Sequence, residues 1–282
     1  MFSDPSYVPS LSQRIYRVLA KILTTIFFIN GRSSWGNEFL QSIDPSLSIT
    51  NPITSKQLHF KTGHGRLFWR VTTTPSLELE TNHWISRLKP SDIFLDVGSN
   101  IGLYSLMAAQ AIECKVYSFE MEPLNYSIQH YNILANNLNN YIYAFPFALS
   151  STTSLSEVYY KSISPGDALH SINRPSPMLL LKENSRFIQD TIATVSLDDF
   201  FSLYSLPLPT HLKLDVDGCE YEILTGALHV VLPSIREVLV EVDQHSYSSI
   251  STILFESGFS LICEYPPHST NINNFNVLYV RS

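Results

Sequence analysis

Cysteine and basic residues are both scarce in this chain of 282 residues. The three cysteines, Cys114, Cys219 and Cys263, lie far apart, and no Cys-x-x-Cys pair occurs. This spacing does not support a structural zinc site. Three unpaired cysteines are expected of a protein in a reducing compartment, so we predict a cytoplasmic location. The formal net charge is −7 and there is no basic block, which argues against nucleic acid as a partner, because phosphate neutralisation dominates such binding.

No apolar run is long enough to span a bilayer, which takes about 20 residues. The strongest candidate, residues 15–29, places apolar residues on one helical face, but Arg17 and Lys21 interrupt it. No basic start precedes this segment, so a signal peptide is not expected. We predict an amphipathic helix that packs on the catalytic domain or on a second subunit of a homo-oligomer. Peripheral contact with a membrane surface is the alternative.

The apolar content of 44% is enough for a large core, and no internal repeat or low-complexity segment occurs. We predict an N-terminal extension over residues 1–75, with a small hairpin within residues 59–73, and a larger domain over residues 76–282. Residues 151–191 are rich in Ser, Pro and Gly and predict a long insertion with little sheet. Such insertions often set substrate choice. His170 is the histidine of interest there, and a solvated loop histidine is the plainer interpretation.

A strand, a glycine turn and a helix follow one another in the middle of the chain. Ile93–Val97 is apolar and β-forming, Gly98–Gly102 breaks the strand, and Leu103–Ala111 favours a helix. An α/β fold begins a nucleotide site in this way. A dinucleotide fingerprint has a glycine where this chain has Asn100, so a cofactor without phosphates fits better. Asp96 directs a carboxylate at the turn, which suits an ammonium or sulfonium charge.

A second strand, Lys115–Phe119, ends at an acidic residue, Glu120. In doubly wound folds an acid about 20 residues beyond the glycine turn accepts hydrogen bonds from ribose hydroxyls. Glu122 is a second candidate for this contact. The ends of two neighbouring strands therefore converge on one adenosine.

Several stretches of the chain share their pattern with one known family. They are Asp96–Ser105, Phe119–Glu120, Asn125–Tyr126 with Asn132 and Asn136–Asn137, Ala148–Ser150, Val195–Asp199, and Lys213–Leu224 with Gly226–Ala227. In these stretches the chain resembles the FkbM family of S-adenosylmethionine-dependent methyltransferases, from about Glu78 to Glu241. Two positions depart from the family pattern: Met121 replaces a proline, and Asp217 replaces a glutamate.

The resemblance implies a class I, Rossmann-like methyltransferase fold. This is an α/β fold with a mostly parallel seven-stranded sheet, an antiparallel last strand and helices on both faces. Alternating strand and helix patterns support the α/β class directly, whereas the number and order of strands come from the resemblance. The implied activity is transfer of a methyl group from S-adenosyl-L-methionine to a hydroxyl, most often of a sugar in a glycan, glycolipid or natural product.

The resemblance also implies which residues form the cofactor site and the catalytic site. The expected cofactor contacts are Asp96, Gly98, Ser99, Asn100, Gly102, Glu120, Ala148 and Asp215. A hydroxyl is a poor nucleophile until its proton leaves, and Asp215 and Asp217 are the expected catalytic acids, since paired carboxylates raise one another's pKa. Alternatively, Asp215 only binds the cofactor amino group and Asp217 caps the next helix.

Three other interpretations remain open. A divalent metal could bind Asp215 and Asp217 together with Glu241, Asp243 and His245, but capping and solvation explain these residues more simply, so no metal is expected. The acceptor could be a protein or a non-sugar small molecule. The chain could also be a catalytically silent binding or scaffold module, although the intact cofactor motif argues against this. A dehydrogenase is weaker still because of Asn100.

Overall fold

The centre of the main sheet consists of short apolar strands that run parallel. They are β3 (Ile93–Val97), β4 (Lys115–Phe119), β5 (Ile142–Phe145), β10 (His211–Leu214) and β11 (Glu237–Val242). β12 (Phe259–Glu264) and β13 (Phe275–Arg281) complete a seven-stranded sheet of order β12-β13-β11-β10-β3-β4-β5. β13 is antiparallel to both of its neighbours, and the remaining pairings are parallel. The predicted sheet, with its antiparallel last strand, is confirmed.

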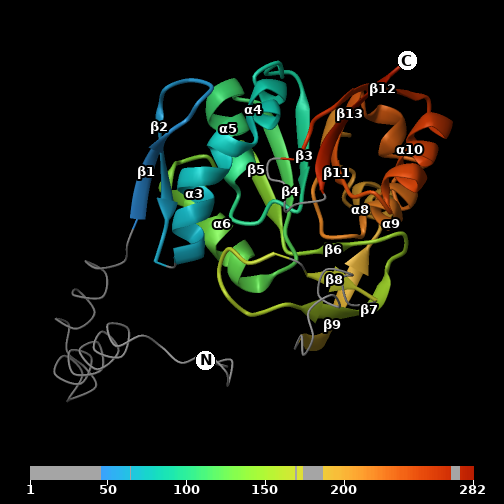
Figure 1. Cartoon of the computed structure of the whole chain (residues 1–282), viewed down its shortest axis with the longest axis horizontal. Helices are drawn as coiled ribbons and strands as arrows, with labels where there is room; N and C mark the ends of the chain where they lie inside the picture. Colours follow the sequence, from blue (N-terminus) through green and yellow to red (C-terminus); the bar gives the residue numbers. More distant parts are fainter. Residues whose placement is uncertain (1–45, 64, 169, 174–186, 268–273) are drawn as a thin grey trace. The chain divides into compact units, whose positions relative to one another are not determined.

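Figure 1 shows the computed structural model that gives this fold. It describes residues 46–282 apart from residues 64, 169, 174–186 and 268–273, and the described residues belong to one compact unit. The helix predicted at residues 15–29 lies outside this part of the chain. Within the described ranges, no helix has the length and apolar character needed to cross a membrane.

Helices cover both faces of the main sheet because apolar side chains alternate along its strands. Phe94 points to one face and Leu95 and Val97 to the other, which is the two-residue period of a strand. The first face packs on α3 (Gly65–Leu77), α4 (Leu79–Ile85), α5 (Leu103–Ile112) and α6 (Pro123–Ala135). The second packs on α8 (Leu197–Tyr204), α9 (Glu220–Thr225) and α10 (Tyr247–Glu256). The predicted arrangement of helices on both faces is confirmed.

The prediction that the insertion contains little sheet is wrong, because much of it forms a second, smaller sheet. Its strands are β6 (Ala148–Leu149), β7 (Ser154–Tyr160), β8 (Ser171–Ile172) and β9 (Ile188–Val195), in the order β6-β9-β7-β8. Ser156 and Val158 of β7 are buried on either side of the exposed Glu157, and Tyr159 and Tyr160 are buried after them, although the serines and threonines of these strands resemble loop residues in sequence. Figure 1 shows this sheet below the ends of the main strands.

The N-terminal hairpin occurs earlier in the chain than predicted. It consists of β1 (Ser46–Thr50) and β2 (Gln57–Lys61), which pair antiparallel, whereas most of residues 59–73 belong to α3. Leu67, Val71 and Thr74 are buried at helical spacing, so packing overrides the β preference of this segment. The compact unit begins at Ser46, and the predicted boundary after residue 75 falls inside α3.

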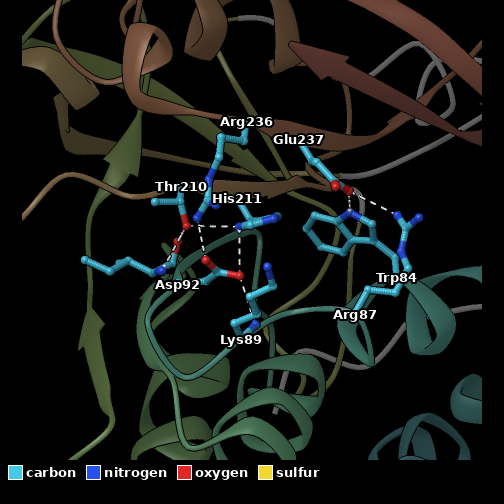
Figure 2. Close-up of polar contacts among 9 residues, drawn as sticks. Trp84, Arg87, Lys89, Asp92, Thr210, His211, Arg236 and Glu237 are labelled. Atoms are coloured by element: carbon cyan, nitrogen blue, oxygen red, sulfur yellow. Dashed lines mark hydrogen bonds and ion pairs between the residues drawn. The ribbon is translucent and has the colours of Figure 1, made fainter. Parts of the chain in front are cut away.

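A polar network joins the strands at the end of the sheet where β3 and β10 begin (Figure 2). The buried Asp92 carboxylate accepts hydrogen bonds from the Arg236 guanidinium and from the Lys89 backbone N–H at 2.9 Å, and lies 3.9 Å from Nδ1 of His211. Burial opposes the charge on Asp92, but these partners outweigh it and lower its pKa. The Thr210 hydroxyl also accepts a hydrogen bond from the backbone N–H of Ile93 at 3.0 Å.

Beside this network, the buried Trp84 anchors α4 to the sheet. Its indole N–H donates to Glu237 at 2.8 Å, and Arg87 donates to the same carboxylate at 3.0 Å (Figure 2). The Trp84 ring packs edge-on against Phe94 of β3. The start of the sheet is thus held by polar as well as apolar contacts.

We expect Asp92→Asn to lower the free energy of unfolding by about 1–3 kcal/mol, because it removes the charge of a buried acceptor that pairs with Arg236 and with the Lys89 backbone N–H. The pKa of Asp92 is lower in the folded state than its ordinary value of 3.8. The stabilisation is therefore present above that value and is lost as the pH falls through the folded pKa, so the difference from wild type should shrink in acid. Urea unfolding at pH 7 and at acid pH tests this, with the exposed Glu256→Gln as the control. Equal stability of wild type and Asp92→Asn at pH 7 would contradict it.

Candidate active site

The glycine turn after β3 lies directly against the backbone that follows β10. Gly98 has a φ of +81°, and a Cβ at this position would lie 1.9 Å from the carbonyl oxygen of Asp215. The backbone N–H groups of Gly98 and Ser99 each donate to the carbonyl of Phe119 at 3.0 Å. Only glycine fits at position 98, and the turn connects the carboxyl ends of three neighbouring strands.

Glu120 is buried at the end of β4 and faces the turn. One of its carboxylate oxygens accepts from the Asn100 backbone N–H at 2.8 Å, and the other accepts from the Glu122 N–H at 2.7 Å. Burial raises the pKa of Glu120 to about 7, despite these two donors. Glu122, the second predicted ribose contact, instead caps α6 by accepting from the Asn125 N–H at 2.7 Å.

Three predicted cofactor residues lie behind the turn instead of lining the cavity. Asp96 accepts from the Ser105 hydroxyl at 2.5 Å, and its other oxygen has no hydrogen-bond partner. Ser99 donates to the Phe119 carbonyl at 3.2 Å, and Gly102 lies close to α6. Burial raises the pKa of Asp96. The structure gives these residues a supporting position for the turn.

Asn100 connects the turn to the insertion. Its side-chain N–H donates to the Asp167 carbonyl at 2.9 Å, and Asn125 of α6 donates to the same oxygen at 3.1 Å. The backbone N–H of Gly166 donates back to the Asn125 side chain at 2.7 Å. The Asn100 Oδ1 atom has no partner among the described residues. The amide that was expected to face the cofactor therefore also holds the insertion in place.

A cavity opens between the turn, the ends of β4 and β10, and the insertion. Its lining includes six of the predicted site residues, namely Gly98, Asn100, Glu120, Ala148, Asp215 and Asp217. It also includes Phe147, and His170, the histidine of interest in the insertion. The lining residues that the sequence did not identify as site residues are Arg70, Met121, Asn125, Asp167, Ala168 and Ile172. Those from α3 and the insertion reach the cavity only through long-range contacts, so no local sequence signal marks them.

A buried lysine carries the positive charge beneath this cavity. The Nζ atom of Lys213 lies 2.5 Å from a carboxylate oxygen of Asp215 and 5.0 Å from the centre of the Tyr104 ring. Burial disfavours the ammonium, but the carboxylates of Asp215, Glu78 and Asp96 outweigh it and raise the pKa of Lys213. Lys213 lies in β10 and Asp215 directly follows the strand, so the ion pair holds Asp215 at the strand end.

Further carboxylates surround Asp215, and the sequence analysis did not assign them to the active site. Burial and the charges of Asp217 and Asp215 raise the pKa of Glu220 to about 8, against the hydrogen bonds that it accepts. Burial and the charge of Asp215 likewise raise the pKa of Glu241, and burial raises the pKa of Glu78. Acidic side chains therefore outnumber Lys213 around the strand ends, and a cationic ligand would favour their ionised forms.

The residues that were considered for a metal site make other contacts in the structure. Asp243 accepts from the backbone N–H groups of His245 and Ser246, at 2.8 and 2.7 Å, at the start of α10. The N-cap position of α9 is Cys219, two residues beyond Asp217, so Asp217 does not occupy the cap position that was its alternative role. In the part of the chain that the structure describes, no three histidine, cysteine or acidic residues are grouped to hold a metal ion. Metal independence stays a prediction.

A mostly parallel sheet with a glycine turn and an acidic strand end at its centre is typical of the class I methyltransferase fold. Comparison with known proteins gives the same class. The model of the methyltransferase FkbM domain matches residues 96–261. The chain belongs to this family, as its motifs predicted, and it is a methyltransferase.

The chain is also similar to individual proteins of known name. It is 26% identical over 208 residues to methyltransferase sdnD of Sordaria araneosa, covering 65% of this chain and 80% of that protein. It is 24% identical over 175 residues to hexuronic acid methyltransferase AglP of Haloferax volcanii, covering 62% and 65%. Among solved structures, precorrin-6y C5,15-methyltransferase of Geobacter metallireducens is 11% identical, with a TM-score of 0.44, and the match covers 79% of this chain and 95% of that one.

We expect Gly98→Ala to lower the free energy of unfolding by more than about 2 kcal/mol, because the new methyl group would overlap the Asp215 carbonyl. Gly65→Ala is the matched control, since nothing lies within 4 Å of a Cβ there, and its stability should stay within about 0.5 kcal/mol of wild type. Urea unfolding of both variants tests this. A Gly98→Ala variant as stable as Gly65→Ala would contradict the close approach.

Proposed function

We propose that the cavity binds S-adenosyl-L-methionine and that the enzyme transfers its methyl group to a hydroxyl of a sugar. The observation that carries this proposal is the position of Glu120, a buried carboxylate at the end of β4 beside the Gly98 turn. In doubly wound folds this is the place from which an acid binds ribose hydroxyls. The unpaired Asn100 oxygen and the excess of carboxylates around Asp215 fit an adenosyl sulfonium cofactor.

Two residues of the chain have different roles in this reaction, one in cofactor binding and one in proton removal. The bound cofactor supplies an already activated methyl group, so the protein has to position the acceptor and remove its proton. Asp215 is held by Lys213, which suits it to receive the cofactor's ammonium group. Asp217 lines the cavity two residues further on and takes the proton from the acceptor hydroxyl.

The sugar acceptor is supported by one relative and by the family. The protein AglP is named a hexuronic acid methyltransferase, and the chain is 24% identical to it. Uronic acids and other sugars with free hydroxyls are therefore the first acceptors to screen. Proteins and non-sugar small molecules are the next groups in the screen, because the fold itself does not select an acceptor.

Cofactor binding should weaken as the pH falls below about 7. Ribose hydroxyls donate to the ionised form of Glu120, whereas the free protein holds this carboxyl with a pKa of about 7. Binding must then release a proton, so the Kd for S-adenosylhomocysteine should be about tenfold higher at pH 6 than at pH 8. Calorimetry in buffers of different ionisation enthalpy measures both the Kd and the proton released.

Two controls and one contrary outcome make this experiment decisive. Glu120→Ala should lose most of the affinity at both pH values, which removes the pH dependence. NADH should not bind, because Asn100 stands where a dinucleotide site has glycine. A folded wild type that binds neither S-adenosylmethionine nor S-adenosylhomocysteine would overturn the proposed cofactor.

Asp217 and Asp215 should differ in the step that each supports. Asp217→Asn should lower kcat about 10²–10⁴-fold and leave the Kd for S-adenosylhomocysteine nearly unchanged, because it removes only the proton acceptor. Asp215→Asn should instead weaken cofactor binding. Rates of S-adenosylhomocysteine formation with an accepted sugar, combined with calorimetry, separate the two effects, and Glu256→Gln serves as the surface control. A fully active Asp217→Asn enzyme would exclude Asp217 as the base.

A further inference from the structure

His170 is a buried side chain in the cavity that lacks any hydrogen bond. It is 7% exposed, and neither ring nitrogen has a partner. Among the described residues it is the one side chain with two such unpaired buried atoms. Polar groups inside proteins are nearly always hydrogen-bonded, so both nitrogens are explained best by a ligand that enters the cavity.

The segment that carries His170 is fixed on three sides. Arg66 of α3 forms an ion pair with Asp167 at 2.6 Å, and Arg70 donates to the Gly166 carbonyl at 2.5 Å. The side chains of Asn100, in the glycine turn, and Asn125, in α6, donate to the Asp167 carbonyl. His170 follows shortly after this clamp, and its position is therefore set by the glycine turn and by α3.

The ring itself packs against Tyr160 of β7. The two ring centres are 5.3 Å apart, in an edge-on arrangement. Burial lowers the pKa of His170 to about 4, with the opposing charge of Asp167 and the like charges of Lys161, Arg70 and Arg66 as smaller influences. The imidazole is neutral at pH 7, so one of its nitrogens donates a hydrogen bond and the other accepts one.

The neighbours of His170 place it at the Glu120 end of the cavity. Asn100 links the two, because its backbone N–H donates to Glu120 at 2.8 Å and its side chain donates to the carbonyl of Asp167, three residues before His170, at 2.9 Å. Asp215 follows β10, on the far side of β3 from β4. The cavity thus has an acidic ribose end near His170 and a separate end near Asp215.

We propose that His170 binds the adenosine half of the cofactor through both ring nitrogens, so that the insertion selects the cofactor as well as covering it. This rests on the proposed use of S-adenosylmethionine. Adenine edges and ribose hydroxyls each offer a donor and an acceptor, which matches a neutral imidazole. The residue is not expected to contact the acceptor sugar or the methyl group.

The test compares two ligands that share only the adenosine half, S-adenosylhomocysteine and 5′-methylthioadenosine. Calorimetry with His170→Ala should show both affinities lowered by at least about tenfold and by similar factors, as expected for the loss of two hydrogen bonds. His170→Gln keeps a donor and an acceptor and should recover most of the affinity. His130→Ala removes an exposed histidine from α6 and should bind both ligands like wild type.

Several outcomes would overturn the proposal. Unchanged affinities in a folded His170→Ala variant would do so, and so would a loss confined to S-adenosylhomocysteine, since that would place His170 beside the amino-acid half. A wild type that binds neither ligand would overturn the cofactor assignment and this inference together. Failure of the histidine variants alone leaves the cofactor assignment standing.

A spectroscopic measurement on the wild type detects the hydrogen bonds of His170 directly and needs a variant only to assign the resonances. The protein has nine histidines, and the ¹⁵N resonances that are missing in His170→Gln identify His170. Saturation with S-adenosylhomocysteine should lock one tautomer and move these two resonances apart. Resonances that stay unchanged in the saturated protein would show that the ring makes no hydrogen bond to the ligand.

Discussion

The close approach of the Gly98 turn to the Asp215 carbonyl is the constraint on which the site depends. β3 and β10 pair in parallel register up to Val97, and the Asp215 N–H then donates to the Val97 carbonyl at 3.1 Å. The chain continues from β3 to β4 and β5 in one direction and from β10 to β11 in the other. Ligands bind at such a switch point in open α/β sheets. A side chain at position 98 would clash with the Asp215 carbonyl and force the two segments apart.

Electrostatics at this point follow from one buried cation among many acids. Lys213 neutralises Asp215 and lies near Asp96 and Glu78, yet the pKa values of Glu78, Glu220 and Glu241 are all raised. The strand ends therefore hold more acidic side chains than Lys213 can pair with, and their ionised forms are disfavoured. A ligand with ammonium and sulfonium charges would stabilise the ionised forms, which is the physical reason for proposing a cationic cofactor over a phosphate-containing one.

The elements that the sequence predicted well are those whose signal is local. Strands β3 and β4 have the predicted bounds, and α5 begins at the predicted Leu103. The predicted residues at strand ends, such as Gly98 and Glu120, line the cavity for the same reason. Segment α3 was missed because its β-branched and aromatic residues favour a strand until Leu67 and Val71 are packed.

The insertion shows where local reasoning fails and why this matters for the site. Its strands are polar, and their pairing joins residues far apart in the sequence, such as Glu157 with Thr191. The contact between Asn100 and Asp167 also spans 67 positions, and neither residue alone indicates it. The cofactor motif and the insertion are therefore parts of one structure, since the amide of Asn100 holds the segment that carries His170. A change of sequence in the insertion would reach the Glu120 end of the cavity through these hydrogen bonds, without altering any residue of the glycine turn.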